Sequence, residues 1–257
     1  PGVKVHFVEQ PEMRGQSHAL YLAKEHLHGP MLMVFADTLI EANLSFLDGE
    51  EAGAIAWVKP VPDPRRFGVA ALRSDGWVDR LIEKPQSLEN NLVVVGFYYF
   101  QQAEALIAAI EEQMRRGIQL KGEYFLADAV NIMLEHGLKM RTEQVEVWLD
   151  AGVPATVLET NAYLLAHGHD NSAEAAKRPG VTIIPPVFID PTAQVERSVI
   201  GPHVSIAAGC KVEDSLIRSS ILEDQAKVSQ AVLEDSLVGR RAVVDGRTNR
   251  LNTGDDS

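Results

Sequence analysis

The sequence has little of several things that mark particular protein classes. It contains one cysteine, Cys210, so an intrachain disulfide framework is excluded, and we interpret Cys210 as a small buried residue. The longest apolar run, near residues 92–100, is too short to cross a membrane. No segment combines a basic start, an apolar middle and a small-residue cleavage site, so no secretion signal is visible. These absences favour a cytoplasmic location.

Basic residues are also scarce relative to acidic ones. The chain has 24 Lys and Arg against 36 Asp and Glu, a formal net charge of −12. A large nucleic-acid surface needs clustered basic side chains, so this class of partner is not expected. A small nucleotide substrate is still compatible with the charge, because a local pocket and a metal ion can offset the global field.

The first two thirds of the chain alternate between strand and helix patterns. Strands are expected at 3–8, 31–36, 54–59, 92–100 and 140–147, a hairpin at 67–72 and 77–82, and helices at 17–28, 103–116, 124–136 and 153–166. The continuous apolar run 31–36 suits a central parallel strand that is buried on both faces. This alternation predicts an α/β domain over residues 1–166, with a mostly parallel sheet and flanking helices.

The pattern changes at His167. Residues 167–180 are polar and small and are interpreted as a linker. From residue 181 apolar β-branched or leucine side chains recur at intervals of six, and a serine–apolar phrase starts at Ser198, Ser215, Ser220 and Ser236. Hexad spacing predicts a parallel β-helix over 181–247, with an antiparallel sandwich as the alternative. Residues 248–257 are expected to be disordered.

Two acidic residues follow predicted strands of the first domain. Asp37 comes directly after the run 31–36, and Asp150 lies between the strand 140–147 and the helix 153–166. Ligands of open α/β sheets bind at the carboxyl ends of strands, where a carboxylate can hold Mg²⁺. Either residue could equally be an ordinary turn or cap aspartate.

Other candidates lie in loops and strand ends. Glu83 and Lys84 close a strand before a proline, and could serve sugar hydroxyls and a phosphate, or form a solvated ion pair. The strand glycines Gly68 and Gly96 mark either a close ligand or a bulge. Gln10, which precedes Gly15, offers a donor and an acceptor that suit the edge of a pyrimidine base, or it is a plain loop residue.

These pieces occur in a distinctive order. The order is Gln10-Pro-x-x-x-Gly15, an apolar strand ending in Asp37, Arg66-Phe-Gly68, Glu83-Lys84-Pro85, Asn91 to Gly96, Lys121-Gly-Glu123 and Trp148-Leu-Asp150-x-Gly152. It resembles the nucleotidylyltransferase family that includes glucose-1-phosphate thymidylyltransferases, in the longer form with a C-terminal left-handed β-helix. The resemblance covers nearly the whole chain. It implies the Rossmann-like fold of nucleotide-diphospho-sugar transferases.

The resemblance also implies roles for individual residues. Asp37 and Asp150 match the acids that hold the catalytic Mg²⁺, Glu83 the residue that binds sugar hydroxyls, and Lys84 the lysine on the sugar phosphate. Backbone contacts to the sugar are implied for Gly68 and Val94, with Gly96 in the same strand. Gln10 and Gly15 match the pair that reads the base in thymidylyl- and uridylyltransferases. The implied reaction transfers dTMP or UMP from a nucleoside triphosphate to a hexose 1-phosphate, glucose 1-phosphate being the common choice, and releases pyrophosphate.

The sequence departs from the family pattern in places. The Gly-x-Gly-Thr-Arg type loop that wraps the triphosphate is absent, and at the usual spacing of strand–helix units it would precede Pro1 by roughly 60 to 80 residues. We therefore expect a chain that lacks its natural N-terminus and is inactive by itself. Ala36 and Ala151 stand where the family has a glycine and a small polar residue or cysteine.

Two rival interpretations remain from the sequence. A non-catalytic regulatory relative that binds an NDP-sugar is the alternative to an enzyme, although both Asp37 and Asp150 are present. An acyltransferase module would need a catalytic histidine between coils, and His203 is the one histidine of the repeat region. We expect the β-helix to serve assembly, and the protein to be a homo-oligomer without nucleic-acid or membrane partners.

Overall fold

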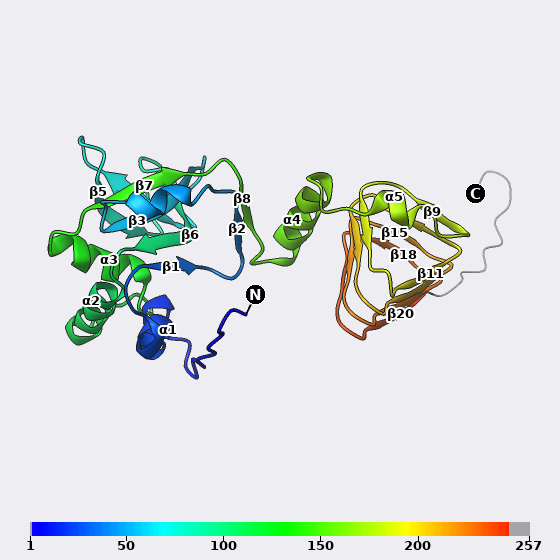
Figure 1. Cartoon of the computed structure of the whole chain (residues 1–257), viewed down its shortest axis with the longest axis horizontal. Helices are drawn as coiled ribbons and strands as arrows, with labels where there is room; N and C mark the ends of the chain where they lie inside the picture. The colour runs from blue at the N-terminus through cyan, green and yellow to red at the C-terminus, as the bar shows by residue number, and fades with distance from the viewer. Residues whose placement is uncertain (1, 247–257) are drawn as a thin grey trace. The chain divides into compact units, whose positions relative to one another are not determined.

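The structure, a computed structural model, describes residues 2–246. The chain forms two compact units, Pro1–Trp148 and Leu149–Ser257 (Figure 1). The division falls inside strand β8 (Trp148–Asp150), whereas the sequence placed the end of the first domain at residue 166. Helix α4 (Pro154–Ala166), expected in the first domain, therefore groups with the C-terminal unit.

The N-terminal unit is built on a mixed sheet. Five strands run in the order β5-β4-β6-β3-β7, and β1 pairs with the C-terminal half of β6. The bounds are β1 Met31–Val34, β3 Ala54–Pro60, β4 Gly68–Leu72, β5 Val78–Glu83, β6 Leu92–Phe100 and β7 Met140–Gln144, with a short β2 at Thr38–Ile40. Within this sheet β3 and β7 are parallel, and the other described pairs are antiparallel, so the predominance of parallel pairing that we predicted is not seen.

Two of the predicted strands differ in the structure. The run 31–36 is not a central strand buried on both faces: β1 pairs only with β6 among the described residues, and Leu32 and Val34 are each 45% exposed. Residues 3–8 form no strand, and Phe7 is 95% exposed. An apolar run is buried on both faces only where other elements cover both, and among the described residues β1 has one paired strand and residues 3–8 have none.

Strand β3 shows why the middle of the sheet is buried on both faces. Ala54, Ala56 and Val58 face a core formed with helices α2 and α3, while Ile55 and Trp57 face a second core on the other side. Side chains alternate along a strand, so a wholly apolar strand requires cover on both faces. The sequence predicted this strand within one residue at its end.

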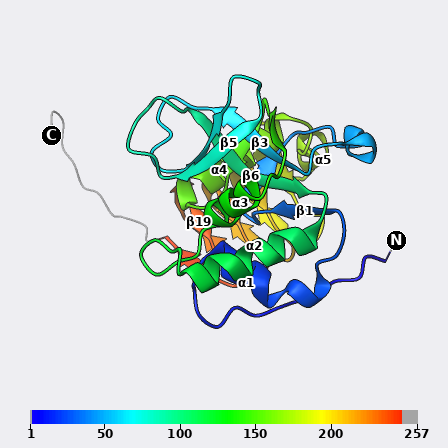
Figure 2. The same ribbon diagram turned by 90° about the vertical axis from the view of Figure 1, so that its left-hand side faces the viewer.

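The α-helices of this unit lie together on one side of the sheet, whereas a 3-10 turn that contains Phe46 and Leu47 packs against the core on the other side. Their bounds are α1 Gln16–Leu22, η1 Lys24–His26, α2 Ala103–Arg116 and α3 Leu126–Glu135, and a 3-10 turn, η2, spans Ser45–Gly49. Helix α2 packs against both α1 and α3, and α1 lies beside it in Figure 2. Gly117 adopts φ +66° and ends α2 as the sequence predicted, since glycine enters the left-handed region without steric cost.

The C-terminal unit is a parallel β-helix of four coils with three faces. The faces are the sheets β9-β12-β15-β18, β10-β13-β16-β19 and β11-β14-β17-β20, all paired in parallel. The bounds are β9 Val181–Ile183, β10 Val187–Ile189, β11 Gln194–Glu196, β12 Ser198–Ile200, β13 Val204–Ile206, β14 Lys211–Glu213, β15 Leu216–Arg218, β16 Ile221–Leu222, β17 Lys227–Ser229, β18 Val232–Glu234, β19 Leu237–Val238 and β20 Val243–Asp245. The parallel β-helix is confirmed, and an antiparallel sandwich is excluded. Residues 248–257, expected to be disordered, lie outside the described residues.

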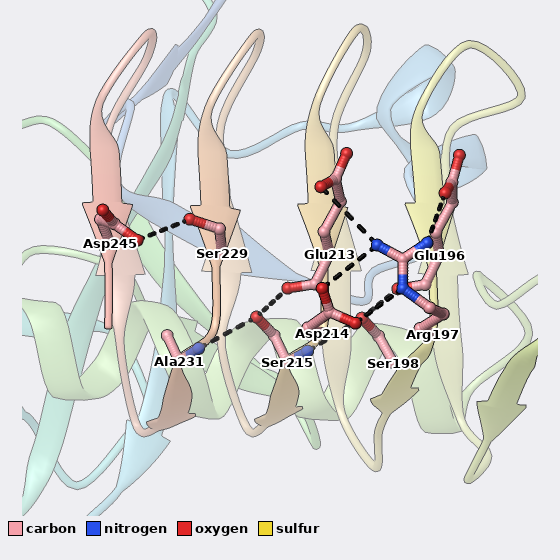
Figure 3. Close-up of polar contacts among 9 residues, drawn as sticks. All are labelled: Glu196, Arg197, Ser198, Glu213, Asp214, Ser215, Ser229, Ala231 and Asp245. Atoms are coloured by element: carbon pink, nitrogen blue, oxygen red, sulfur yellow. Dashed lines mark hydrogen bonds and ion pairs between the residues drawn. The ribbon is translucent and has the colours of Figure 1, made fainter. Parts of the chain in front are cut away.

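The recurring serine phrase marks corners of the β-helix. Each serine of the phrase follows a residue with positive φ, as Arg197 (+46°) precedes Ser198. The Oγ of Ser215 donates to the carbonyl oxygen of Glu213 at 2.7 Å and accepts from the N–H of Ala231 in the next coil at 3.2 Å. Figure 3 shows this ladder of stacked corners, with the Arg197 guanidinium bonded to Asp214 of the next coil at 2.7 Å. The recurring serine thus occupies a turn, and its hydroxyl makes the hydrogen bond that links this turn to the adjacent coil.

The segment expected as a linker contains a helix that packs on the β-helix. Helix α5 (Ser172–Ala175) lies within residues 167–180, and both of its end residues are buried. The Ser172 hydroxyl accepts from the N–H of Val187 at 2.8 Å. The end of the first coil is therefore covered by part of its own chain, which meets the need of a stacked repeat for a cap. None of the helices among residues 2–246 is long and apolar enough to span a bilayer.

Candidate active site

A cavity of about 1010 Å³ lies beside helix α1 and the end of strand β1. Its lining includes three residues that the sequence singled out, Gln10, Gly15 and Asp37, together with Gln16 and Glu123. Much of the remaining lining is apolar and comes from Met13, Leu20, Met33 and Phe35. A large pocket with an apolar lining and a few polar groups is typical of a small-molecule site.

Gln10 and Gly15 are bonded to one another within this cavity. The Gln10 Nε2 donates to the carbonyl oxygen of Gly15 at 3.1 Å and also lies 3.0 Å from the His18 Nδ1. The loop from Gln10 to Gly15 is therefore closed by its own first side chain. The role of these two residues toward a base stays a prediction.

Gly15 is required by the packing of its own backbone. It adopts φ +91°, and a Cβ there would lie 2.5 Å from the carbonyl oxygen of Tyr124. The same Tyr124 oxygen accepts from the N–H of Ser17 at 3.2 Å, and the Tyr124 N–H donates to the Arg14 oxygen at 2.8 Å. The start of α1 is thus fixed against residue 124, and only glycine allows that approach.

Asp37 lies in the turn that follows β1 and is exposed to solvent. Within the described part of the chain its carboxylate has no hydrogen bond or ion pair, and it lines the cavity near Gln16. Both of its oxygens are therefore available to a ligand. Two residues earlier, the Phe35 N–H donates to the Gly96 oxygen at 2.9 Å, which fixes where the turn begins.

Gly68 and Glu83 face each other across the hairpin of β4 and β5. They are register partners, and a Cβ on Gly68 would lie 3.1 Å from the Glu83 Oε2. The Lys84 Nζ lies 3.9 Å from the Glu83 Oε1 and 5.1 Å from the centroid of the Phe125 ring. The half-buried Glu83 carboxylate thus lies beside the flexible Lys84 ammonium group. Because Gly68 has no side chain, the space next to the carboxylate is open.

Burial shifts the pKa of this carboxylate upward. The pKa of Glu83 is raised mainly by desolvation, the positive charge of Lys84 lowers it, and the negative charges of Asp128 and Glu123 raise it by smaller amounts. Burial also raises the pKa of Asp128, and the pKa of Tyr98 is raised by burial and by Glu83. A partly buried carboxyl group with a raised pKa is a functional candidate. A ligand that donates hydroxyl hydrogen bonds to the carboxylate would stabilise its charged form.

The sequence also singled out two positions of strand β6, Val94 and Gly96, and their surroundings differ. Val94 belongs to the core on the helix side of the sheet, so only its backbone could meet a ligand. Gly96 adopts φ +77° beside a register shift, and a Cβ there would lie 2.4 Å from the Phe35 ring. The bulge and this packing account for the glycine without a ligand.

Asp150 belongs to the C-terminal unit. Its Oδ1 accepts from the N–H of Gly152 at 3.0 Å, in the turn that precedes α4. This bond uses one of the two carboxylate oxygens and leaves the other for a ligand. A metal ion shared by Asp37 and Asp150 stays a prediction, and residues 2–246 contain no cluster of three or more potential ligands from His, Cys, Asp and Glu.

Three residues near the site received no role from the sequence. Glu123 lines the cavity, and its negative charge is the smallest of the causes that raise the pKa of Glu83. Asp128 acts on the same carboxylate, and Gln16 lines the cavity next to Gly15. Of these three residues, Glu123 had a signal in the sequence, the motif Lys121-Gly-Glu123. The other two lie at helical positions, where a polar residue is ordinarily taken to be a surface residue.

Comparison with known proteins agrees with this arrangement. A family model described as nucleotidyl transferase matches residues 1–167, which is more than half of the chain. The chain belongs to the nucleotidyl transferase family. A second model, described as the GMPPB C-terminal domain, matches residues 183–253 of this nucleotidyl transferase. The family predicted from the ordered motifs is confirmed, and the second model covers most of the region predicted as a β-helix.

Several relatives of the nucleotidyl transferase cover most of its length. It is 29% identical to the glucose-1-phosphate thymidylyltransferase of Streptomyces griseus, over 100% of this chain and 79% of the relative. It is 28% identical to the same enzyme of Streptomyces antibioticus, over 95% and 74%. Such relatives place the chain among the sugar-1-phosphate nucleotidyltransferases, and its enzyme class is confirmed.

A solved structure supports the fold alone. It comes from Bacillus anthracis, is assigned to the glucose-1-phosphate thymidylyltransferases and matches with a TM-score of 0.51 at 23% identity. The match covers 60% of this chain and 62% of the solved chain, so it spans less than two thirds of that protein.

Proposed function

We propose that this nucleotidyl transferase moves dTMP or UMP from a nucleoside triphosphate to glucose 1-phosphate and releases pyrophosphate. The observation that carries the proposal is that one unit holds both a large, mostly apolar cavity with Gln10 and Gly15 and a half-buried acid, Glu83, beside Lys84. The cavity suits a base, and Glu83 with Lys84 suits a phosphorylated sugar. Glu123 lines the cavity and its charge acts on Glu83, so we place this residue between the two substrates.

The reaction is an in-line displacement. An oxygen of the sugar phosphate attacks the α-phosphorus, a new P–O bond forms, and the bond to the leaving pyrophosphate breaks. The protein contributes little covalent chemistry: it holds two anions that repel each other in an orientation that permits attack. Lys84 offsets the charge of the sugar phosphate, and Glu83 accepts hydrogen bonds from sugar hydroxyls. Gly68 leaves the space in which the sugar approaches that carboxylate.

We propose Mg²⁺ as the divalent metal ion of this reaction. Mg²⁺ is usually held by one or two carboxylates together with substrate phosphates, so a three-acid cluster is not required. Asp37 has two unpartnered oxygens and would be a ligand of the ion, and Asp150, of the C-terminal unit, is the second ligand that the family resemblance implies. When bound, the ion would neutralise negative charge on the phosphates. The family's use of a divalent metal supports this assignment, and the choice of Mg²⁺ is our proposal.

A direct assay tests the function. The purified protein, expressed with any residues encoded ahead of Pro1, is incubated with Mg²⁺, each of the five common nucleoside triphosphates and a panel of sugar 1-phosphates. Pyrophosphate release with dTTP or UTP and glucose 1-phosphate is the expected result. Release with none of the pairs would contradict the proposal, and release with another pair would correct the substrate. We further propose a cytoplasmic homo-oligomer assembled in part through the β-helix, which size-exclusion chromatography with light scattering tests.

A further inference from the structure

The Lys84 ammonium lies between two unlike groups. Its Nζ is 5.1 Å from the centroid of the Phe125 ring and 3.9 Å from the Glu83 Oε1. The distance to the ring is that of a cation–π contact, in which the negative face of the ring attracts the ammonium. The distance to the carboxylate is longer than the roughly 2.7–3.2 Å of a hydrogen bond between nitrogen and oxygen. The ammonium is therefore beside the carboxylate without being bonded to it.

The backbone of Lys84 sets the direction in which its side chain leaves the strand. Lys84 has φ +47° and precedes Pro85, although the residue before a proline normally takes an extended conformation. Its N–H donates to the Phe67 oxygen at 3.0 Å. Such a strained conformation persists only where the surroundings determine it, and strained residues cluster at functional sites. The base of the Lys84 side chain is thus fixed, and its long flexible end needs a further contact to be placed.

The Phe125 ring that supplies this contact stands on a rigid support. Phe125 directly precedes α3 and is 6% exposed. Its carbonyl oxygen accepts from the Ser17 Oγ of α1 at 3.1 Å and from the Gln113 Nε2 of α2 at 2.9 Å, and both of these polar residues are fully buried. The backbone under the ring is therefore tied to two other helices. A group held in this way can preorganise the side chain that it contacts.

We propose that Phe125 is a positioning residue that holds the Lys84 ammonium ready for the phosphate of the sugar substrate. This rests on the proposed function, in which Lys84 binds that phosphate. An aromatic ring attracts an ammonium group without neutralising its charge, so the charge and the N–H donors stay available to a phosphate. A direct ion pair with Glu83 would instead occupy the ammonium and also the carboxylate that accepts from the sugar hydroxyls. The ring thus keeps both groups free for the substrate.

Fluorination of the ring tests the contact at nearly constant shape. Replacing Phe125 by mono-, di- and trifluorinated phenylalanine withdraws electron density from the ring face and weakens its attraction for the ammonium stepwise. We expect the KM for glucose 1-phosphate to rise with each step, by about two- to fivefold for the trifluorinated protein, which is the size of one exposed cation–π contact. The kcat and the nucleotide KM should change little, because the phosphate contact is made equally in the ground state and the transition state.

Trifluorination of Phe46 is the matched control. The Arg141 guanidinium lies 5.0 Å from the centroid of the Phe46 ring, and Phe46 packs against the core on the other face of the sheet. The control weakens a cation–π contact of the same length, and it should leave both KM values unchanged. Phe125→Leu removes the ring and should raise the KM for glucose 1-phosphate at least as much as trifluorination does. A KM for glucose 1-phosphate that is insensitive to fluorine at Phe125, or a nucleotide KM that rises equally, would overturn the proposal.

A double-mutant cycle in stability does not depend on activity, so the two claims fail in different ways. Trifluorination of Phe125 should raise the unfolding equilibrium constant, measured by urea denaturation, about two- to fivefold more in the unmodified protein than in Lys84→Met. Equal changes in the two backgrounds would overturn the proposal even if the protein releases pyrophosphate. Coupling between Phe125 and Lys84 without pyrophosphate release would support the placement of Lys84 by the ring and contradict the proposed reaction.

Discussion

Gly68 and Glu83 are register partners across the β4–β5 hairpin, and a Cβ on the glycine would lie 3.1 Å from the Glu83 Oε2. This distance is shorter than ordinary van der Waals contact, so any side chain at residue 68 must displace the carboxylate. Because Gly68 has no left-handed φ to preserve, the effect of a substitution there is one of space and not of backbone strain.

Gly68→Ala is therefore expected to raise the KM for the sugar 1-phosphate about three- to tenfold while the KM for the nucleotide changes little, since small misplacements of binding groups are costly. Initial-rate kinetics with each substrate varied in turn measures both constants. Gly49→Ala is the control, because a Cβ at Gly49 has nothing within 4 Å and its φ is not left-handed. Equal changes in both constants would contradict a sugar-side role for Gly68.

The sequence predicted the burial of some residues correctly and of others wrongly. Hexad positions such as Ile189, Ile206 and Leu222 are all buried, because a coil of fixed geometry repeats the same inward position. The apolar run 31–36 gave a wrong placement for β1, because burial depends on neighbours that a local pattern does not reveal. The close approach of the Tyr124 backbone to Gly15 was equally invisible, because Tyr124 lies far away in the chain.

Glu83→Gln is expected to change stability and activity in opposite directions. The folded-state pKa of Glu83 is raised above its usual value, so the folded state binds the proton more tightly than the unfolded state. Stability associated with this group is present at low pH and falls as pH rises from the usual value of 4.5 through the raised one. The variant, which carries no charge, should gain stability over the unmodified protein at pH 7 and show little gain at pH 4.

Urea denaturation at the two pH values measures this difference, and turnover provides the other readout. An amide accepts hydroxyl hydrogen bonds more weakly than a carboxylate, so Glu83→Gln should lower kcat/KM for the sugar phosphate by roughly tenfold and weaken discrimination among sugars. A variant that is less stable at pH 7 than at pH 4, relative to the unmodified protein, would show that burial does not disfavour the Glu83 charge.

Lys84→Ala tests the phosphate assignment. The Lys84 backbone is fixed by its N–H bond to the Phe67 oxygen at 3.0 Å, and its side chain is half exposed, so truncation should leave the fold intact. Loss of one ammonium group should raise the sugar-phosphate KM by about tenfold or more, with a smaller effect on the nucleotide KM. Equal effects on both substrates in initial-rate measurements would assign Lys84 to the triphosphate instead.

Asp37→Asn and Asp150→Asn are expected to cut turnover on the order of 100-fold or more, because they weaken the ligands of the proposed Mg²⁺. Stability should change by only about 0.5 kcal/mol for Asp150→Asn, since the amide oxygen can still accept from the Gly152 N–H. Turnover across a Mg²⁺ series, together with thermal unfolding, separates the two effects. Unchanged turnover at saturating Mg²⁺ in either variant would remove that residue from the site.

The serine corners of the β-helix give a prediction about stability that is independent of chemistry. Ser215 is buried, and its Oγ both donates to the Glu213 oxygen and accepts from the Ala231 N–H. Ser215→Ala leaves that N–H without a side-chain acceptor, which should destabilise the protein by about 1–3 kcal/mol. Urea denaturation at pH 7 measures the change.

Ala231 provides the matched variant, because it occupies the corner position in the next coil and follows Gln230, which has φ +51° as the residues before the serines do. The Ser229 oxygen stands where the Glu213 oxygen stands one coil earlier: each accepts the N–H of the following coil, from Gly246 at 2.9 Å and from Gln230 at 3.1 Å. A serine at 231 could therefore donate to the Ser229 oxygen as Ser215 donates to Glu213. Ala231→Ser should then be neutral or stabilising by up to about 1 kcal/mol. If Ser215→Ala is harmless, or Ala231→Ser destabilises as much as Ser215→Ala, the serines do not act through these bonds and the corner geometry alone holds the coils.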